Sequence, residues 1–191
     1  MQNVLIISGH PNLSESIGNA TILDEVAKAL PEAEIRCLDA LYPDYRIDVA
    51  REQQALLEAD VIVWQFPFSW YSVPGLMKLW IDQVLVHGFA HGSTAKLGGK
   101  KLIISFTAGA PEGLYSPEGL FGHDIQQYIT PFETTALLCN LDLQDPVYTF
   151  GMSYAGRDEA KVLEQKTLAK VHAARLITAI KETTLALKMA V

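Results

Sequence analysis

The segment Val61-Ile62-Val63-Trp64-Gln65-Phe66 is apolar at every position except Gln65. A strand with one face in water alternates between apolar and polar residues, whereas a strand covered on both faces is apolar almost throughout. Such strands occur mainly in parallel sheets that carry helices on both sides. This segment therefore predicts a central strand of a parallel sheet.

The sequence on both sides of this segment alternates between expected strands and expected helices. Four further short apolar runs are expected strands, namely residues 4–7, 35–38, 102–106 and 147–150. Expected helices cover residues 17–30, 48–58, 124–138 and 158–181, and another begins at Pro74. Together these units predict an α/β fold, a flavodoxin-like doubly wound five-stranded parallel sheet of order 2-1-3-4-5 with helices on both faces. We expect a single domain over residues 1–191.

Composition and charge exclude several classes of protein. The 191 residues are 49% hydrophobic and 19% charged, which is typical of a chain with a buried core and not of a disordered one. The net charge is −7 without any basic cluster, so we expect no nucleic-acid partner. Cys37 and Cys139 lack the spacing of metal ligands, so we expect no metal site. The start of the chain resembles a first strand and not a signal peptide, and no apolar run reaches the roughly 18 to 20 residues of a membrane span, so a cytoplasmic protein is expected.

Ligands of doubly wound sheets bind beyond the carboxyl ends of the strands. The loop after the first strand, residues 8–19, has neither the Gly-x-Gly-x-x-Gly pattern of dinucleotide sites nor a P-loop lysine. It places Ser14, Ser16 and Asn19 at the start of a helix, where hydroxyls and free backbone N–H groups hold phosphate. A serine at this position equally serves as an ordinary helix cap, and His10 equally as a ligand or as a structural residue.

The loops after the third and fourth strands supply aromatic and small residues. Phe68, Trp70 and Tyr71 follow the third strand, and we expect that a loop cannot bury them in the core, so they require a planar ligand or a partner surface. The loop of residues 107–119 contains small residues that let the backbone approach a ligand closely. Tyr115 in this loop is either a hydrogen-bond donor or a surface residue.

A long and distinctive string carries a family resemblance. It comprises Trp64-Gln65-Phe66-Pro67-Phe68-Ser69-Trp70-Tyr71-Ser72-Val73-Pro74, residues 78–84 and Gly88-Phe89-Ala90, together with Gly9-His10-Pro11, Leu41-Tyr42-Pro43-Asp44 and Ile47-Asp48. The chain resembles the flavin-dependent NAD(P)H:quinone oxidoreductases of flavodoxin-like fold. Within that family it is similar to the ancillary flavoproteins of Kef-type glutathione-regulated potassium-efflux systems.

This resemblance implies a flavin site built from all three loops. The cofactor implied is FMN, with FAD as the alternative. Its phosphate would lie on Ser16, Ile17, Gly18 and Asn19, with His10 beside it. Its ring would lie against Pro67, Phe68, Ser69 and Trp70, with the polar edge on Thr107, Ala108, Gly109 and Ala110. Tyr115 would be the catalytic hydrogen-bond donor.

The resemblance also implies a reaction and partners. NAD(P)H would pass hydride through flavin N5 to a quinone at one shared site, which predicts ping-pong kinetics. The alternative function is a regulatory ancillary subunit of a potassium-efflux transporter, with the flavin partly structural and the protein held at the inner face of the membrane by that partner. A one-electron carrier is disfavoured, because it needs no substrate cavity.

The sequence departs from the family pattern at two positions near the expected site. Where animal-type members carry a histidine partner for the tyrosine, this chain has Phe121, with His123 two residues later, and His91 replaces a family tyrosine.

Met77 and Ile81 are expected to form a second apolar stripe on their helix. With the aromatic loop, this stripe predicts a homodimer whose sites lie at the subunit interface.

Overall fold

Parallel strands form the middle layer of the protein, and the computed structural model describes residues 2–189. The strands are β1 (Val4–Ser8), β2 (Glu34–Cys37), β3 (Val61–Pro67), β4 (Lys101–Thr107), β5 (Asp142–Leu143) and β6 (Val147–Thr149). The helices are α1 (Gly18–Ala29), α2 (Leu38–Leu41), α3 (Val49–Glu58), α4 (Gly75–Val84), α5 (Ile125–Leu138) and α6 (Glu159–Met189). Two short 3-10 turns, Leu13–Glu15 and Glu112–Leu114, lie in the first and third of the predicted ligand loops.

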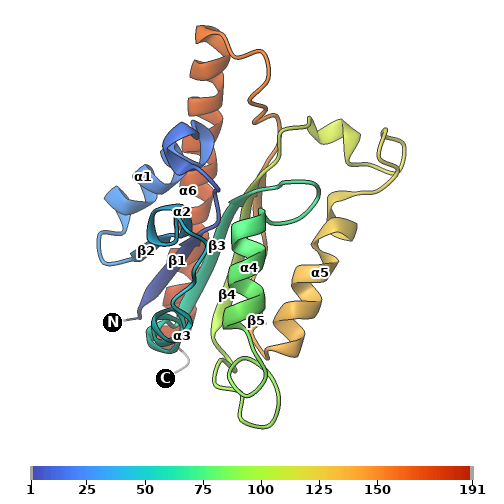
Figure 1. Cartoon of the computed structure of the whole chain (residues 1–191). Coiled ribbons are helices and arrows are strands. Elements are labelled where there is room, and N and C mark those ends of the chain that lie inside the picture. The colour runs from blue at the N-terminus through green and yellow to red at the C-terminus, as the bar shows by residue number, and fades with distance from the viewer. Residues whose placement is uncertain (1, 190–191) are drawn as a thin grey trace.

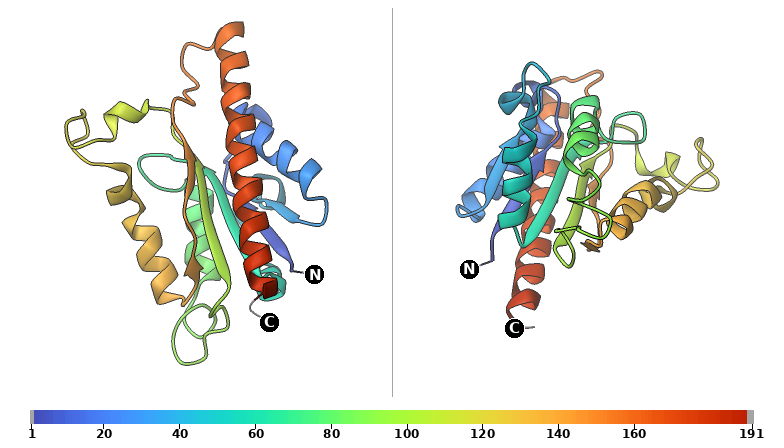
Figure 2. Two further views of the ribbon diagram at one scale, coloured as in Figure 1. Left: turned by 180° about the vertical axis from the view of Figure 1, so that it is seen from behind. Right: turned by 60° about the horizontal axis from the view of Figure 1, so that its bottom comes forward.

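The sheet has the predicted order, β2-β1-β3-β4-β5, and every pairing in it is parallel. Helices α1 and α6 cover one face, and α3, α4 and α5 cover the other (Figures 1 and 2). The side chains of β3 alternate between the two cores: Val61 and Val63 pack on the α1 and α6 side, whereas Ile62 and Trp64 pack on the other side. Burial on both faces explains why this segment is apolar and confirms the flavodoxin-like α/β fold.

The expected fifth strand, residues 147–150, corresponds to β6, and a short strand that was not predicted, β5, precedes it along the edge of β4. β5 pairs with the start of β4 at Lys101 and Leu102, and β6 pairs with its end at Ser105–Thr107. Between β5 and β6 lies Pro146, which has no backbone N–H and therefore cannot donate to the sheet. Both β5 and β6 therefore pair with the outer edge of β4, and the loop that follows β6 lies at the carboxyl end of the sheet.

Helix α4 does not carry the second exposed stripe that the sequence suggested. Met77 is fully buried, and Ile81 is half-buried against the same core, so this expectation was wrong. Met77 packs beneath the first loop: a Cβ atom placed on Gly9 would lie 2.2 Å from its Sδ atom. Gly9 is therefore required for the close approach of this loop to α4.

Within residues 2–189, no helix combines the length and apolar character needed to cross a bilayer.

Candidate functional site

The loops that follow β1, β3, β4 and β6 meet at the carboxyl end of the sheet, which is the upper end in Figure 1. They enclose a cavity of about 670 Å³, within the size range of small-molecule sites. Most predicted site residues line it: His10, Ser16, Gly18, Asn19, Pro67, Phe68, Ser69, Trp70, Thr107, Gly109, Ala110 and Tyr115. Ile17 and Ala108 do not line it. Lining residues that the sequence did not single out as ligands are Pro11, Asn12, Glu15, Tyr71, Phe121, Met152, Tyr154 and Arg157.

The loop at the start of α1 offers hydrogen-bond donors, and Glu15, directly before Ser16, adds a carboxylate to the same cavity lining. Ser16 caps the helix, because its Oγ accepts from the backbone N–H of Asn19 at 3.0 Å. The Ser16 hydroxyl proton and the backbone N–H groups of Ile17 and Gly18 have no acceptor within residues 2–189. Ser16 thus serves as a cap and still has a proton to donate, and free donors at a helix start favour an anion.

His10 and Arg157 lie on the same side of the cavity as this loop. The Nδ1 atom of His10 accepts from the backbone N–H of Asn12 at 3.1 Å, which leaves Nε2–H as a donor. Burial lowers the pKa of His10 below its ordinary value, and the nearby charge of Asp39 opposes this shift only in part. Arg157, whose Nε donates to the Ser153 carbonyl at 3.3 Å, adds a cation to the lining. A neutral donor and a cation therefore stand beside the expected phosphate position.

The aromatic loop after β3 is a tight hairpin turn. Ser69 and Ser72 exchange two backbone hydrogen bonds of 3.0 Å, and the two residues between them have positive φ angles, +48° at Trp70 and +64° at Tyr71. A left-handed conformation costs roughly 1–2 kcal/mol for a residue with a side chain. Strained backbone of this kind is concentrated at functional sites, where the surrounding structure maintains it.

The three aromatic residues of this loop have different environments. Phe68 is 9% exposed and packs on Phe106 with ring centroids 4.8 Å apart, so the expectation that the core could not hold it was wrong. Tyr71 stacks on Tyr128 at 5.3 Å and is 42% exposed. Trp70 is 92% exposed, which leaves its ring available to a ligand or a partner.

Tyr115 closes the cavity from the third loop. Burial raises the pKa of its hydroxyl, and Tyr71 and Tyr128 raise this pKa further, so the group remains a protonated donor at neutral pH. Phe121, where the resemblance implies a histidine, packs edge-on against its ring at 5.1 Å. His123 packs on Tyr128 instead, at 6.0 Å, and neither His123 nor His91 lines the cavity.

The backbone after β4 provides the remaining donors. The N–H group of Ala108 donates to the Thr149 carbonyl at 2.8 Å and its side chain is fully buried, so Ala108 supports the loop and does not face the cavity. The N–H groups of Gly109 and Ala110 have no acceptor in the described part of the chain. Two adjacent free donors at a cavity wall can stabilise negative charge on a ligand.

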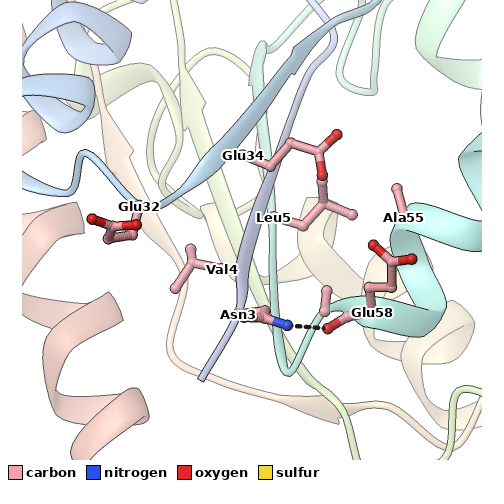
Figure 3. A pocket seen from close by; sticks show the side chains of 8 residues that line it. Asn3, Val4, Leu5, Glu32, Glu34, Ala55 and Glu58 are labelled. Atoms are coloured by element: carbon pink, nitrogen blue, oxygen red, sulfur yellow. Dashed lines mark hydrogen bonds between the residues drawn. The ribbon is translucent and has the colours of Figure 1, made fainter. Parts of the chain in front are cut away.

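A second, smaller pocket of about 240 Å³ lies near the amino end of β1 (Figure 3). Its lining includes the carboxylates of Glu32, Glu34 and Glu58, and Asn3 spans it by donating from Nδ2 to the Glu58 carbonyl at 2.9 Å. Three carboxylates repel an anionic ligand, so this pocket does not compete with the main cavity as a phosphate site. Within residues 2–189, no group of three or more His, Cys, Asp or Glu residues is placed to hold a metal ion.

A family model described as flavodoxin-like fold matches residues 2–173. The chain belongs to this family. It shares 33% identity with general stress protein 14 of Treponema denticola, solved in complex with FMN, over 94% of this chain and 99% of that one, with a TM-score of 0.82.

Two further solved structures are similar to this chain. A protein described as a thermophilic tryptophan halogenase from Streptomycin violaceusniger is 35% identical over 88% of this chain and 97% of that one, with a TM-score of 0.77. The NAD(P)H:quinone oxidoreductase of Methanothermobacter marburgensis has a TM-score of 0.70 at 19% identity, over 92% of this chain and 96% of that one. At that identity, the second likeness concerns the fold alone.

Proposed function

We propose that this protein is an FMN-dependent oxidoreductase that transfers hydride from NAD(P)H to a quinone. The observation that carries the proposal is the meeting, in one cavity, of an anion-binding loop and an aromatic wall. The loop offers the Ser16 hydroxyl and the first N–H groups of α1, with Arg157 as a cation nearby. This donor set fits the phosphate of FMN, and the relative solved with FMN supports the same choice.

Bound FMN would supply the hydride chemistry, and the residues of this chain would orient it. The exposed Trp70 offers a flat surface for its ring, Phe68 lines the same cavity, and the N–H groups of Gly109 and Ala110 would stabilise negative charge that develops on it. Tyr115, which also lines the cavity, would donate a hydrogen bond to the bound ligand. The exposed side, next to Trp70, is where NAD(P)H and then a quinone would bind in turn.

Cofactor release and steady-state kinetics test this proposal. The purified protein is denatured, and the released compound is identified by mass spectrometry, with added FMN, FAD and riboflavin as reconstitution arms. We expect FMN to bind most tightly, and we expect parallel double-reciprocal plots for NAD(P)H and a small quinone. A protein that binds no flavin would contradict the cofactor. Intersecting plots, which indicate a ternary complex, would contradict the shared substrate site.

We further propose that the protein is a homodimer with the cavity at its interface. The support is now the rim of the cavity and not helix α4: Trp70 and Tyr154 line the cavity and are 92% and 85% exposed. Two large rings in water at one cavity mouth favour a partner surface. In a twofold-symmetric dimer, each cavity would be completed by the other subunit.

The alternative role, a regulatory ancillary subunit of a potassium-efflux transporter, rests on the sequence resemblance. It is compatible with the enzymatic role, because the transporter and the substrates need not share a surface. Co-purification of the wild-type protein with such a transporter tests it. Failure of the wild-type protein to co-purify would contradict this role and leave the oxidoreductase proposal intact.

A further inference from the structure

A continuous series of buried polar side chains leads from the surface of α6 to the cavity. Arg175 donates from Nη2 to Thr149 Oγ1 at 2.7 Å, and Thr149 Oγ1 lies 2.9 Å from His172 Nδ1. The opposite ring atom, His172 Nε2, lies 2.8 Å from Ser105 Oγ. Both ring nitrogens are therefore bound, and His172 is fully buried.

The series continues from Ser105 to the wall of the cavity. The Ser105 hydroxyl contacts Gln65 Oε1 at 2.6 Å, and Gln65 Nε2 contacts Asn19 Oδ1 at 2.8 Å. Asn19 Nδ2 then contacts Thr107 Oγ1 at 3.0 Å. Thr107 lines the cavity, and its hydroxyl proton has no acceptor within residues 2–189. We call these seven residues the polar relay: Arg175, Thr149, His172, Ser105, Gln65, Asn19 and Thr107.

The hydrogen bonds of the polar relay can run in either of two directions, and each direction satisfies most of its donors and acceptors. Each hydroxyl has one proton, each amide can be turned over, and a neutral histidine has one N–H on either nitrogen. In the outward direction, every proton points away from Arg175 and Thr107 donates into the cavity. In the inward direction, every proton points toward Arg175 and Thr107 donates back to Asn19.

Arg175 decides between these directions because a guanidinium can only donate. In the inward direction, Thr149 would accept from both Arg175 and His172, and its own proton would be left without an acceptor in a buried position. A buried unsatisfied polar group is costly. In the outward direction, every bond is made, and His172 carries its proton on Nε2.

The state of His172 agrees with this direction. Burial lowers the pKa of the ring to about 3, and the charge of Arg175 lowers this pKa further. The ring is therefore neutral at pH 7 and has a single N–H to place. A charged ring would donate from both nitrogens and break the series.

We propose that the polar relay fixes Thr107 as a hydrogen-bond donor to an acceptor atom of the cavity ligand, with His172 and Arg175 as distant positioning residues. In its choice of FMN as that ligand, the inference rests on the proposed function. The direction of the relay does not depend on any ligand.

The first test measures the tautomer of His172 in the ligand-free protein by ¹⁵N NMR. We expect the proton on Nε2 in the wild type. In the Arg175→Glu variant, a carboxylate accepts from Thr149 and every bond of the relay reverses, so we expect the proton on Nδ1. A wild-type ring with its proton on Nδ1 would overturn the proposal.

The second test measures FMN affinity by fluorescence quenching in an Arg175 series. Arg175→Lys retains a donor and should bind FMN as the wild type does. Arg175→Met leaves both directions open, and selecting one of two equal states costs at most about twofold in affinity. Arg175→Glu removes the donor from the cavity and should weaken FMN binding roughly tenfold, the effect of one lost hydrogen bond.

A double-mutant cycle separates the relay from simple charge repulsion. Thr107→Val should itself weaken FMN binding roughly tenfold, and Thr107→Ser should restore it. If the relay carries the effect, Arg175→Glu adds nothing in the Thr107→Val background; if the added charge acts directly on FMN, the two effects add. Ser8→Ala is the matched control, because Ser8 is buried in the same sheet and its hydroxyl has no partner within residues 2–189.

The outcomes distinguish the inference from the proposed function. Additive effects in the cycle, or an Arg175→Glu variant that binds FMN like Arg175→Met, would overturn the relay. Wild-type protein that binds no FMN would contradict the proposed function, while the tautomer measurement would still decide the direction of the relay. Thermal melting confirms that each variant is folded.

Discussion

Glu52→Gln should be among the most destabilising single substitutions in this protein. Glu52 is fully buried on α3 and accepts hydrogen bonds from three other segments of the chain. Its carboxylate binds the Arg36 guanidinium through both oxygens, the Tyr42 hydroxyl through Oε1, and Trp80 Nε1 through Oε2 at 2.8 Å. This cluster links α3 to β2, to the residue that directly follows α2, and to α4.

Glutamine keeps the shape of the side chain but removes its charge and one acceptor. In the better amide orientation, the NH₂ group replaces Oε2, so the hydrogen bonds from Trp80 Nε1 and from Arg36 Nε to that atom are lost, at about 1 kcal/mol each, while Arg36 keeps its bonds to Oε1. Arg36 is 5% exposed and then retains only Glu34, at 2.7 Å, as a charged partner. Breaking a buried pair from one side costs about 3–5 kcal/mol. We therefore expect a loss of about 3–5 kcal/mol, a large share of the roughly 5–15 kcal/mol of a typical domain.

Urea unfolding followed by tryptophan fluorescence measures this loss as a shift of the midpoint at unchanged slope. The matched control is Glu34→Gln, which removes the other partner of Arg36. The side chain of Glu34 is 51% exposed, so its loss should cost less than about 1 kcal/mol. Equal effects of the two substitutions, or a loss below about 1 kcal/mol for Glu52→Gln, would refute the reasoning.

Four further predictions concern the site and the same cluster. Tyr115→Phe should lower turnover modestly and leave flavin content intact, since only a donor is lost; unchanged rates at every pH would show that Tyr115 is merely a wall. Arg157→Met should weaken binding of FMN roughly tenfold and of riboflavin much less, by calorimetry, because only FMN carries the phosphate; equal losses would contradict a phosphate role. Trp70→Glu should shift a dimer toward monomer in sedimentation and lower activity, whereas a fully active wild-type monomer would defeat the interface. Burial, as the larger cause, and the hydrogen bond to Glu52 raise the pKa of Tyr42 from 10.0 to about 12. Between these pH values the folded state keeps a proton that the unfolded state has lost, so the free energy of unfolding should fall by about 1.4 kcal/mol per pH unit as the pH rises. An unchanged urea midpoint over this range would contradict the prediction.

Local patterns were sufficient to predict the framework of the fold. The apolar run of β3, and the aspartates that cap α3 and α5, act through neighbours in sequence. Asp48 accepts from the Arg51 N–H and Asp124 from the Gln127 N–H, as expected of helix starts. The convergence of three loops on one cavity followed from the rule that places ligands at the carboxyl ends of parallel strands.

The residues that sequence patterns missed act through contacts between distant segments. His172 lies 67 positions from Ser105, on a helix whose sequence gives no sign of a site. Arg157 enters the cavity from the loop after β6, and the sequence offers no local signal for it. Phe68 was misjudged because Phe106, on the neighbouring strand, provides the surface that buries it. These residues reach their partners only when the strands, helix α6 and the loop after β6 have come together in the folded protein.

The alternation of side chains along β4 accounts for the two-sided character of the cavity. Ser105 and Thr107 point toward the face covered by α1 and α6, where they contact His172 and Asn19. Phe106, between them, points to the other face and stacks on Phe66 at 5.8 Å and on Tyr148 at 5.3 Å. Because successive residues of a strand face opposite sides, one short segment supports both a polar wall and an aromatic wall. A shift of β4 by one residue would exchange these walls, so the parallel register of β3 with β4 determines the chemistry of the site as well as the core.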